Sequence, residues 1–234
     1  KKINIVCFGF GQVAKNFIKK INDEGVLFNL KHLKEETKNK KFENISYQSF
    51  QFTEKKFDKN LINKLEEANY ILLSIAPVNG EDIVIKNFEN NFKSHKIKWI
   101  TYLSATSVYG NHHGQWVDES SETIPTSTNG VERLNVEKAW LKLSNKHNLP
   151  IQIFRLSGIY SNQYNILRRL KAGKVKIINK KNHFFSRVHV EDIANILFNS
   201  LKNIKKNEIY NISDDKPASA EEVAMYGVKL LGVE

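Results

Sequence analysis

The chain has 234 residues, of which 41% are hydrophobic and 26% are charged, and its formal net charge is +11. This composition is typical of a soluble globular protein with a sizeable core. It excludes a membrane-spanning protein, because no apolar run reaches the roughly 18 residues of a transmembrane helix. We expect no signal peptide, because Lys1-Lys2 leads directly into an apolar strand. Cys7 is the single cysteine, so no internal disulfide can form, and we predict a cytoplasmic protein.

Most of the positive charge comes from lysines that are scattered along the chain, often beside asparagine, as in residues 38–41 and 202–207. A nucleic-acid groove requires clustered basic residues with stacking aromatic residues among them. We therefore expect no nucleic-acid partner and no membrane partner, and we interpret the lysines as solvated faces. The pair His112-His113 has no cysteine or carboxylate at a metal-ligand spacing, so we expect no metal.

The first predicted element is an apolar strand that breaks on glycine into a helix. The run Ile3–Phe8 stops at Gly9, and Gly11 and Ala14 follow at the G-x-G-x-x-G/A spacing. The glycines allow a tight turn and a close backbone approach, so a dinucleotide pyrophosphate can sit at the helix N-terminus. The alternative is a glycine turn that binds no phosphate. The residues expected to contact the cofactor here are Gly9, Phe10, Gly11, Gln12, Val13 and Ala14.

Strand-like runs then alternate with segments of helical periodicity. The predicted strands are Asn4–Phe8, Val26–Leu30, Ile45–Ser49, Tyr70–Ile75, Ile97–Ser104, Ile151–Leu156, Lys174–Ile178 and Glu208–Ile212. The predicted helices are Gln12–Ile21, Phe57–Leu65, Glu81–Phe92, Asn129–Ser144, Gln163–Lys171, Val190–Leu201 and Ala220–Leu231. This alternation predicts an α/β fold with a doubly wound parallel sheet, in which ligands bind at the carboxyl ends of the strands. We expect residues 1–160 to form a Rossmann-like core that binds NAD or NADP. Residues 161–234 are expected to form a partial substrate lobe, interleaved with the last core strands and helices.

The residues after the second predicted strand bear on the choice of cofactor. Many NAD enzymes place an Asp or Glu about 20 residues beyond the glycines, where it binds the ribose 2′-hydroxyl. Phe28–Lys34 contains no carboxylate, and Lys31, His32 and Lys34 follow the expected strand end at Leu30. Their charge favours the 2′-phosphate of NADP over NAD, with Lys31 and His32 as the binding residues. The alternative is that these lysines belong to the general lysine excess.

Further segments carry recognisable motifs in chain order. Tyr102–Gly110 looks like SS-x-x-VYG, and Pro125–Glu137 looks like P-x-x-x-Y-G-x-x-K-x-x-x-E. Phe154–Tyr160 looks like R-x-x-x-x-YGP, and Phe185–Ala194 looks like R-x-HV-x-D-I-A. Together with the glycine turn, they resemble the extended short-chain dehydrogenase/reductase family, and within it the nucleoside-diphosphate-sugar epimerases and dehydratases. The resemblance covers nearly the whole chain. It implies a cofactor of the NAD(P) type, a nucleotide-sugar substrate, oxidoreductase or epimerase chemistry and a homodimer.

The family's catalytic Ser/Thr, Tyr and Lys are not matched. Counted from the motifs, their positions fall on Ala105, Asn129 and Arg133. An alanine has no polar side-chain atom, an asparagine has no proton to exchange near neutral pH, and an arginine stays charged. The pattern resembles an atypical branch of the family that keeps the cofactor turn, has Arg in place of the Lys and lacks the Tyr. Since Ser104 and Thr106 flank the lost serine, the catalytic candidates are Ser104, Thr106 and Arg133.

Asn129, Arg133 and Glu137 stand at i, i+4 and i+8 and share one helical face. Arg133 then either pairs with Glu137 at the surface or points into the site as a fixed positive charge. The loops after strands and the resemblance supply the other candidates. These are Ser74, Ala76, Arg133, Ser157 and Gly158 for the cofactor, and Ser107, Asn129 and Arg187 for the substrate.

Two functions remain open from the sequence. One is an epimerase/dehydratase or reductase with a degenerate Ser-Tyr-Lys triad. The other is a non-catalytic, dinucleotide-binding sensor or scaffold. The chain stops at Glu234, where the family continues, so we expect a small and truncated substrate lobe.

Overall fold

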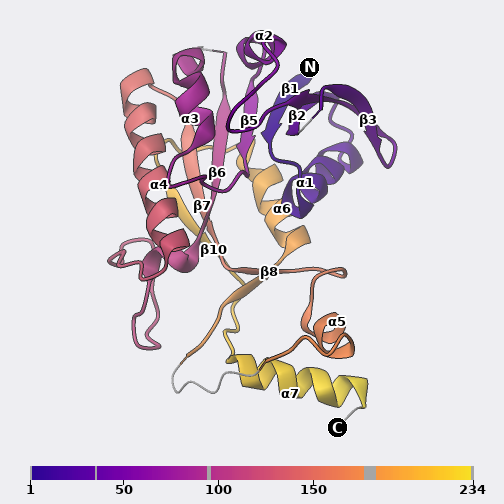
Figure 1. Cartoon of the computed structure of the whole chain (residues 1–234), viewed down its shortest axis with the longest axis vertical. Coiled ribbons are helices and arrows are strands. Elements are labelled where there is room, and N and C mark those ends of the chain that lie inside the picture. Colours follow the sequence, from indigo (N-terminus) through magenta and orange to yellow (C-terminus); the bar gives the residue numbers. More distant parts are fainter. Residues whose placement is uncertain (1, 35, 94–95, 177–182, 233–234) are drawn as a thin grey trace.

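The computed structural model of the chain describes residues 2–34, 36–93, 96–176 and 183–232. Its main sheet has eight strands in the order β10-β7-β6-β5-β1-β2-β4-β3 (Figure 1). The strands are β1 (Ile3–Phe8), β2 (Phe28–Lys34), β3 (Lys38–Phe42), β4 (Ile45–Gln51), β5 (Tyr70–Leu73), β6 (Trp99–Ala105), β7 (Ile151–Leu156) and β10 (Ile209–Ile212). Every pairing is parallel except that of β3 with β4. This confirms the doubly wound sheet, and the strand order reverses between β1 and β5.

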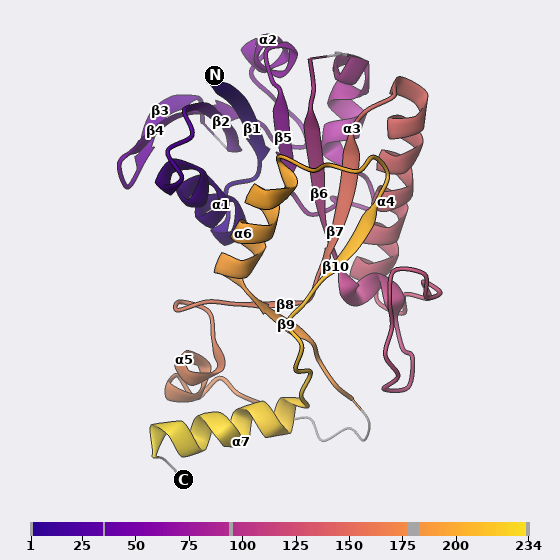
Figure 2. The ribbon, with the colours of Figure 1, turned by 180° about the vertical axis from the view of Figure 1, so that it is seen from behind.

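Helices cover both faces of the main sheet, as Figures 1 and 2 show. Because side chains alternate along a strand, Ile5 and Cys7 face one helix layer, and Val6 and Phe8 face the other. The first layer consists of α1 (Gln12–Asp23) and α6 (Val190–Ser200), and the second of α2 (Asn60–Glu66), α3 (Ile83–Phe88) and α4 (Thr128–His147). Burial on both faces explains the nearly continuous apolar strands of the sequence.

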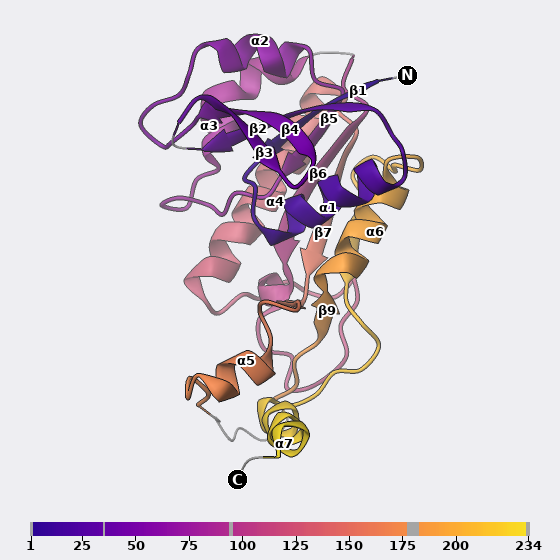
Figure 3. The ribbon, with the colours of Figure 1, turned by 90° about the vertical axis from the view of Figure 1, so that its right-hand side faces the viewer.

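A smaller body lies beyond the carboxyl ends of the strands (Figures 1 and 3). In it, β8 (Gly158–Tyr160) pairs in parallel with β9 (Arg187–His189), and α5 (Ile166–Lys171) packs against α7 (Ala220–Leu231). Between β9 and α7 the chain returns to the main sheet through α6 and β10. Core and lobe therefore alternate along the C-terminal part of the chain.

The structure differs from the sequence prediction at several elements. β3 is an additional edge strand rich in exposed lysine, which gives it no apolar alternation to recognise. β8 and β9 have three residues each, too few for a period to show. The predicted strand Lys174–Ile178 is wrong for residues 174–176, which form no strand, and residues 177–178 lie outside the described part. The predicted helix Glu81–Phe92 divides into α3 and the 3-10 helix η1 (Glu89–Lys93).

Within the described ranges, none of the helices combines the length and the apolar character that a membrane span requires.

Candidate functional site

The glycine turn joins the end of β1 to the start of α1. Gly9 has φ +92°, a conformation that favours glycine, and a Cβ there would lie 2.6 Å from Ser74 Oγ. Gly11 is the N-cap of α1, and nothing lies within 4 Å of the position that its Cβ would take. No side chain caps α1, and no acidic residue stands in its first turn. Among the described residues, no capping side chain therefore accepts from the first N–H groups of α1, and the cradle beside Gly11 is open.

Ser74 supports this turn from the neighbouring strand. It follows β5 directly, and its hydroxyl donates to Phe8 O at 2.9 Å while its backbone N–H donates to the same oxygen at 2.8 Å. Its side chain fills the space that a Cβ of Gly9 would need. Ser74 therefore fixes the end of β1, and Ala76 follows in the same loop at the reversal of strand order.

The other residues of the turn are held by packing. Phe10 lies against Tyr47, with ring centroids 5.1 Å apart. Val13 and Ala14 are buried in the core between α1 and the sheet. Gln12 Oε1 is buried and has no hydrogen-bond partner within the described ranges. A buried acceptor of this kind needs a donor, which a bound ligand or a water can supply.

The end of β2 bears on the predicted cofactor. β2 ends at Lys34, not at Leu30 as predicted, so the residues that follow the strand are Glu35 and Glu36. A preference for NADP requires a strand end without a carboxylate, and the predicted strand end at Leu30 is wrong. Glu35 lies outside the described residues. The backbone of His32 is in register with Cys7 of β1, and the side chain of His32 also lies outside the described part.

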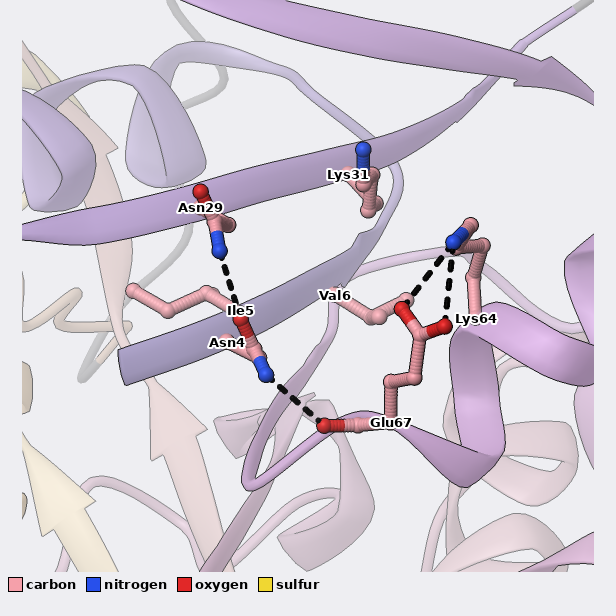
Figure 4. A pocket seen from close by; sticks show the side chains of 7 residues that line it. All are labelled: Asn4, Ile5, Val6, Asn29, Lys31, Lys64 and Glu67. Atoms are coloured by element: carbon pink, nitrogen blue, oxygen red, sulfur yellow. Dashed lines mark hydrogen bonds and ion pairs between the residues drawn. The ribbon is translucent and has the colours of Figure 1, made fainter. Parts of the chain in front are cut away.

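Lys31 lies within β2 and not at its end. It is in register with Val6, and its Nζ donates to Gln48 Oε1 at 2.8 Å. Burial lowers the pKa of Lys31. The side chain lines a pocket of about 230 Å³, drawn in Figure 4, whose lining residues are Asn4, Ile5, Val6, Asn29, Lys31, Lys64 and Glu67.

This pocket lies on the α2 face of the sheet, near the amino ends of β1 and β2. Asn29 donates to Asn4 Oδ1 at 2.8 Å, and Lys64 of α2 pairs with Glu67 at 3.0 Å (Figure 4). The glycine turn, in contrast, follows the carboxyl end of β1 and leads into α1 on the other face. The placement of Lys31 therefore gives no support to its predicted role in cofactor binding.

α4 carries Asn129 and Arg133 to the carboxyl end of β6. The hydroxyl of Ser127 caps the helix by accepting from Gly130 N at 3.1 Å. Gly130 lies so close to the 3-10 helix η2 (Thr106–Tyr109) that a Cβ would be 2.5 Å from Ser107 O. The missing side chain thus lets the first turn of α4 contact the segment that carries Thr106 and Ser107.

Arg133 points toward β6 and does not pair with Glu137. Arg133 is partly buried, and its Nη1 donates to Leu103 O at 3.0 Å. Glu137, one turn later, is 1% exposed and pairs with Arg155 of β7 at 2.7 Å. Of the two alternatives for Arg133, the ion pair with Glu137 is therefore wrong.

A buried polar network lies beneath this part of the site. Arg155 donates to both oxygens of Glu137 and, at 2.9 Å, to the hydroxyl of Tyr109. Ser104 donates to Glu137 Oε1 at 2.5 Å, and Tyr109 donates to Asn211 Oδ1 at 2.7 Å. Burial opposes the charged form of Arg155, but the hydrogen bonds that Arg155 donates to Glu137 and Tyr109 raise its pKa overall. The network joins β6, η2, α4, β7 and β10 below the predicted catalytic positions.

The predicted hydroxyl residues divide between this network and the site. Ser104 is 3% exposed and its proton is engaged by Glu137, whereas Thr106 is half-buried and Ser107 is exposed. Ala105 is half-buried and contributes no polar side-chain atom, and Asn129 is exposed at the start of α4.

The remaining predicted residues lie where the core meets the lobe. Ser157, directly after β7, has a buried Oγ without a hydrogen-bond partner in the part of the chain described. The N–H of the exposed Gly158 donates to Ser186 O at 3.1 Å. Arg187 donates to the carbonyls of Phe185 and Ala218 at 3.0 and 3.3 Å. These contacts tie the substrate candidate Arg187 to the lobe backbone.

Sequence reasoning does not predict the pair of Glu137 with Arg155. A signal for it exists, because Arg155 is the one charged residue of the strand Ile151–Leu156, every residue of which is buried. A buried charge needs a counter-charge, and Glu137 lies in α4, the helix that precedes this strand in the chain. Only the fold identifies which carboxylate turns inward.

The comparisons with known proteins agree with this geometry. Residues 87–213 match the model of the NAD dependent epimerase/dehydratase family, a range that includes Ala105, Asn129 and Arg133. No curated protein matches the sequence at a significant level.

Solved structures match nearly the whole chain. A conserved protein of unknown function from Silicibacter pomeroyi is 27% identical with a TM-score of 0.84, covering 99% of this chain and 79% of its own. The UDP-glucuronic acid 4-epimerase from Bacillus cereus, solved with NAD, is 16% identical with a TM-score of 0.82 and coverages of 99% and 85%. The UDP-N-acetylglucosamine 4-epimerase from Bacillus cereus is 19% identical with a TM-score of 0.74 and coverages of 99% and 85%. The fold and the family model together show that this chain belongs to the NAD-dependent epimerase/dehydratase family.

Proposed function

We propose that this protein binds NAD at the Gly9–Ala14 turn and acts on a nucleotide sugar held at the carboxyl ends of β6 and β7. The observation that carries the proposal is the open cradle beside Gly11, placed where the strand order reverses. A pyrophosphate fits there, because α1 offers uncapped N–H groups and the positive end of its dipole. The unpartnered Gln12 Oε1 is a further group that a ligand can satisfy.

NAD is favoured over NADP by the end of β2. Two carboxylates, Glu35 and Glu36, follow the strand, and a carboxylate there suits a ribose 2′-hydroxyl and repels a 2′-phosphate. Family membership and the NAD bound in the structure of the UDP-glucuronic acid 4-epimerase support the same cofactor.

The chain's own residues bind and orient the reactants. NAD, when bound, supplies a hydride acceptor. Arg133 supplies a fixed positive charge and hydrogen-bond donors. Thr106, Ser107 and Asn129, from η2 and the first turn of α4, supply neutral donors. The buried Ser157 Oγ at the end of β7, which has no hydrogen-bond partner among the described residues, is a group that a bound reactant can satisfy. We assign Ser104 to the buried network and not to proton transfer, because its hydroxyl donates its hydrogen bond to Glu137.

A second function, that of a non-catalytic dinucleotide sensor, is favoured by one observation. The catalytic positions hold Ala105, Asn129 and Arg133, and none of these side chains exchanges a proton near neutral pH. Turnover separates the two functions. Conversion of a nucleotide sugar, or appearance of the near-ultraviolet absorbance of NADH, supports the enzyme, whereas tight NAD binding without either supports the sensor.

The substitution Gly11→Val tests the cofactor site. A Val side chain meets no protein atom near its Cβ and no backbone strain, since φ at Gly11 is −77°, so the apoprotein should keep its melting temperature. The same side chain fills the space meant for phosphate, and we expect the affinity for NAD to fall by at least about 100-fold, roughly 2.7 kcal/mol. Thermal unfolding of the apoprotein measures the melting temperature, and calorimetric titration with NAD and with NADP measures the affinities.

The matched control is Asn22→Ala at the opposite end of α1, an exposed position that should leave NAD affinity unchanged. Equal NAD affinity of Gly11→Val and the unmodified protein would contradict the proposed site. Tighter binding of NADP than of NAD would contradict the proposal that the carboxylates after β2 select NAD.

A further inference from the structure

One long stretch of the chain carries positive charge and no negative charge. No Asp or Glu occurs between Glu137 and Glu191, and this stretch includes β8, α5 and β9 of the lobe. Five cations stand in and directly after α5, and every one of them is exposed. These residues, called the basic cluster below, are Arg168, Arg169, Lys171, Lys174 and Lys176.

The end of α5 brings these cations together. Arg168, Arg169 and Lys171 stand in the last turn of the helix. Gly173 then takes a left-handed conformation, with φ +63°, and the N–H of Lys174 donates to Arg169 O at 2.9 Å. This is the hydrogen bond by which a chain turns back at a helix end. The turn places Lys174 beside Arg169, so the five charges of residues 168–176 lie around one helix end.

The apolar side of α5 faces α7, and this leaves the basic cluster on the outside. A Cβ at Gly227 of α7 would lie 2.6 Å from the side chain of Leu170 and 3.4 Å from that of Leu167. Figures 1 and 3 show α5 beside α7 in the lobe. None of the apolar residues of α5 is exposed beyond the intermediate class, whereas its basic residues are. The cluster thus offers charge without the apolar side chains that a membrane-binding helix inserts.

The protein provides no counter-charge for the cluster in its described part. None of the ion pairs there includes a residue of the basic cluster. Glu221 and Glu222 of the lobe stand in the first turn of α7, where Glu222 is bonded to Ser219 in a capping box. The carboxyl end of α5 contributes only about half an elementary negative charge. Most of the positive charge is therefore available to an anionic partner.

An exposed aromatic ring stands next to the basic cluster. Arg168 Nε donates to Asn162 O at 2.8 Å, which holds this side chain against the turn that precedes α5. Tyr164 belongs to the same turn, because Ser161 N donates to Tyr164 O at 3.0 Å and Ser161 Oγ accepts from Tyr164 N at 3.1 Å. Tyr164 is 63% exposed. Cations beside an exposed aromatic ring are typical of surfaces that bind single-stranded nucleic acids.

We propose that the basic cluster and Tyr164 bind single-stranded nucleic acid. The cations contact phosphates of the backbone, and the ring of Tyr164 stacks on a base. This differs from the expectation drawn from the sequence, which rests on the scatter of lysines over the whole chain. The inference is independent of the proposed function, because the cluster lies in the lobe and the glycine turn lies at the start of α1.

The test measures binding of the intact protein to a labelled single-stranded RNA of about 16 nucleotides by fluorescence anisotropy. We expect the logarithm of the affinity to fall linearly with that of the salt concentration, with a slope of about −0.7 for each phosphate contact. The double variant Arg169→Gln/Lys171→Gln should bind at least about tenfold more weakly at about 100 mM salt, with a slope shallower by about 1.4. Tyr164→Ala should weaken binding and keep the slope, because stacking releases no counterions.

Lys138→Gln/Lys142→Gln is the matched control, since it removes two charges from exposed positions of α4. This variant should keep the affinity of the unmodified protein. Equal losses in the two double variants would show binding by net charge alone and overturn the proposal. So would the absence of RNA binding, or binding to phosphatidylserine vesicles without binding to RNA.

Two further comparisons complete the test. An RNA duplex bound as tightly as the single strand, or an unchanged affinity in Tyr164→Ala, would overturn the stacking contact and with it the preference for single strands. Gly11→Val should retain RNA binding while it loses NAD, so failure of the cofactor site and failure of this surface are distinguishable. Loss of RNA binding in Gly11→Val would contradict a separate surface in the lobe. Melting temperatures of all variants verify that the fold is kept.

Discussion

At the scale of single residues, burial decides what each polar side chain can do. Arg155 is 3% exposed inside a strand, so its charge must be met within the protein, and Glu137 turns inward to meet it. That choice leaves Arg133 bonded to the carbonyl of Leu103 and ties the hydroxyl of Ser104 to Glu137. The same side chains on an exposed helix would have formed the ordinary pair of Arg133 with Glu137.

The buried pair should respond strongly to the loss of one partner. Glu137→Leu leaves Arg155 charged and unpaired, and we expect a loss of about 3–5 kcal/mol in the free energy of unfolding, with a similar loss for Arg155→Met. The double variant should lose less than either single variant, because it contains no isolated charge. Urea unfolding of the four proteins measures these differences.

An exposed ion pair provides the control for that cycle. Lys146 and Glu89 are 2.7 Å apart with side chains 58% and 39% exposed, so Lys146→Met should change stability by less than about 1 kcal/mol. A double variant less stable than both single variants would show that the buried pair is stabilising in itself.

At the scale of elements, the site depends on how closely α4 approaches η2. Gly130 makes the approach, since its missing Cβ would lie 2.5 Å from a backbone oxygen, and Ser127 caps the helix just before it. Gly110 does the same on the other side of η2, where a Cβ would meet Ile124 O at 1.9 Å. Neither glycine belongs to a phosphate-binding turn; both set the distance between neighbouring segments.

Replacing helical glycines by alanine tests this role. An alanine in a helix is intrinsically favoured by about 1 kcal/mol, but at Gly130 the clash is with backbone, which cannot rotate away. We expect Gly130→Ala to destabilise the protein by about 1–3 kcal/mol in thermal or urea unfolding.

Gly227→Ala in α7 is the matched control, because its Cβ would meet side chains and no backbone. The one close approach, 2.6 Å, is to the flexible end of Leu170, which can adopt another rotamer. This variant should be neutral or stabilising. The proposed packing of α4 against η2 would be refuted by a Gly130→Ala variant at least as stable as Gly227→Ala.

At the scale of the whole molecule, the chain folds around a central strand covered on both faces. β1 lies between β2 and β5, and Cys7 within it is fully buried against α1. Burial raises the pKa of the Cys7 thiol far above its usual range, so the reactive thiolate is absent from the folded protein.

Cys7 should therefore report global unfolding. We expect a thiol reagent to label the native protein only at the rate at which the sheet opens, and to label rapidly across the urea transition seen by circular dichroism. If NAD binds at the proposed site, it should slow labelling further, because a ligand of the folded state stabilises that state against opening. Labelling of the native protein at the rate of the unfolded chain would contradict the buried position of β1.

The sequence by itself determined most of the strands and helices of the core, the parallel sheet, the glycine turn and the family, but not β3, β8 or β9. These follow from local patterns: apolar periods, glycine spacing and motifs that act within one segment. Gly9, Gly11 and Ala14 could be placed on a strand–turn–helix unit from their neighbours in the chain alone.

Only the tertiary structure decided how charges pair and where strands end. β2 continues to Lys34 because β1 and β4 pair with it, which no local pattern records, and the charge after the strand changes from basic to acidic as a result. Glu137 chooses Arg155 over Arg133 because the desolvation of a buried arginine outweighs a surface pair, and that arginine comes from a distant strand. On the helical face of Asn129, Arg133 and Glu137, long-range contacts thus turned Glu137 into a buried partner of Arg155 and left Arg133 bonded to the backbone of β6.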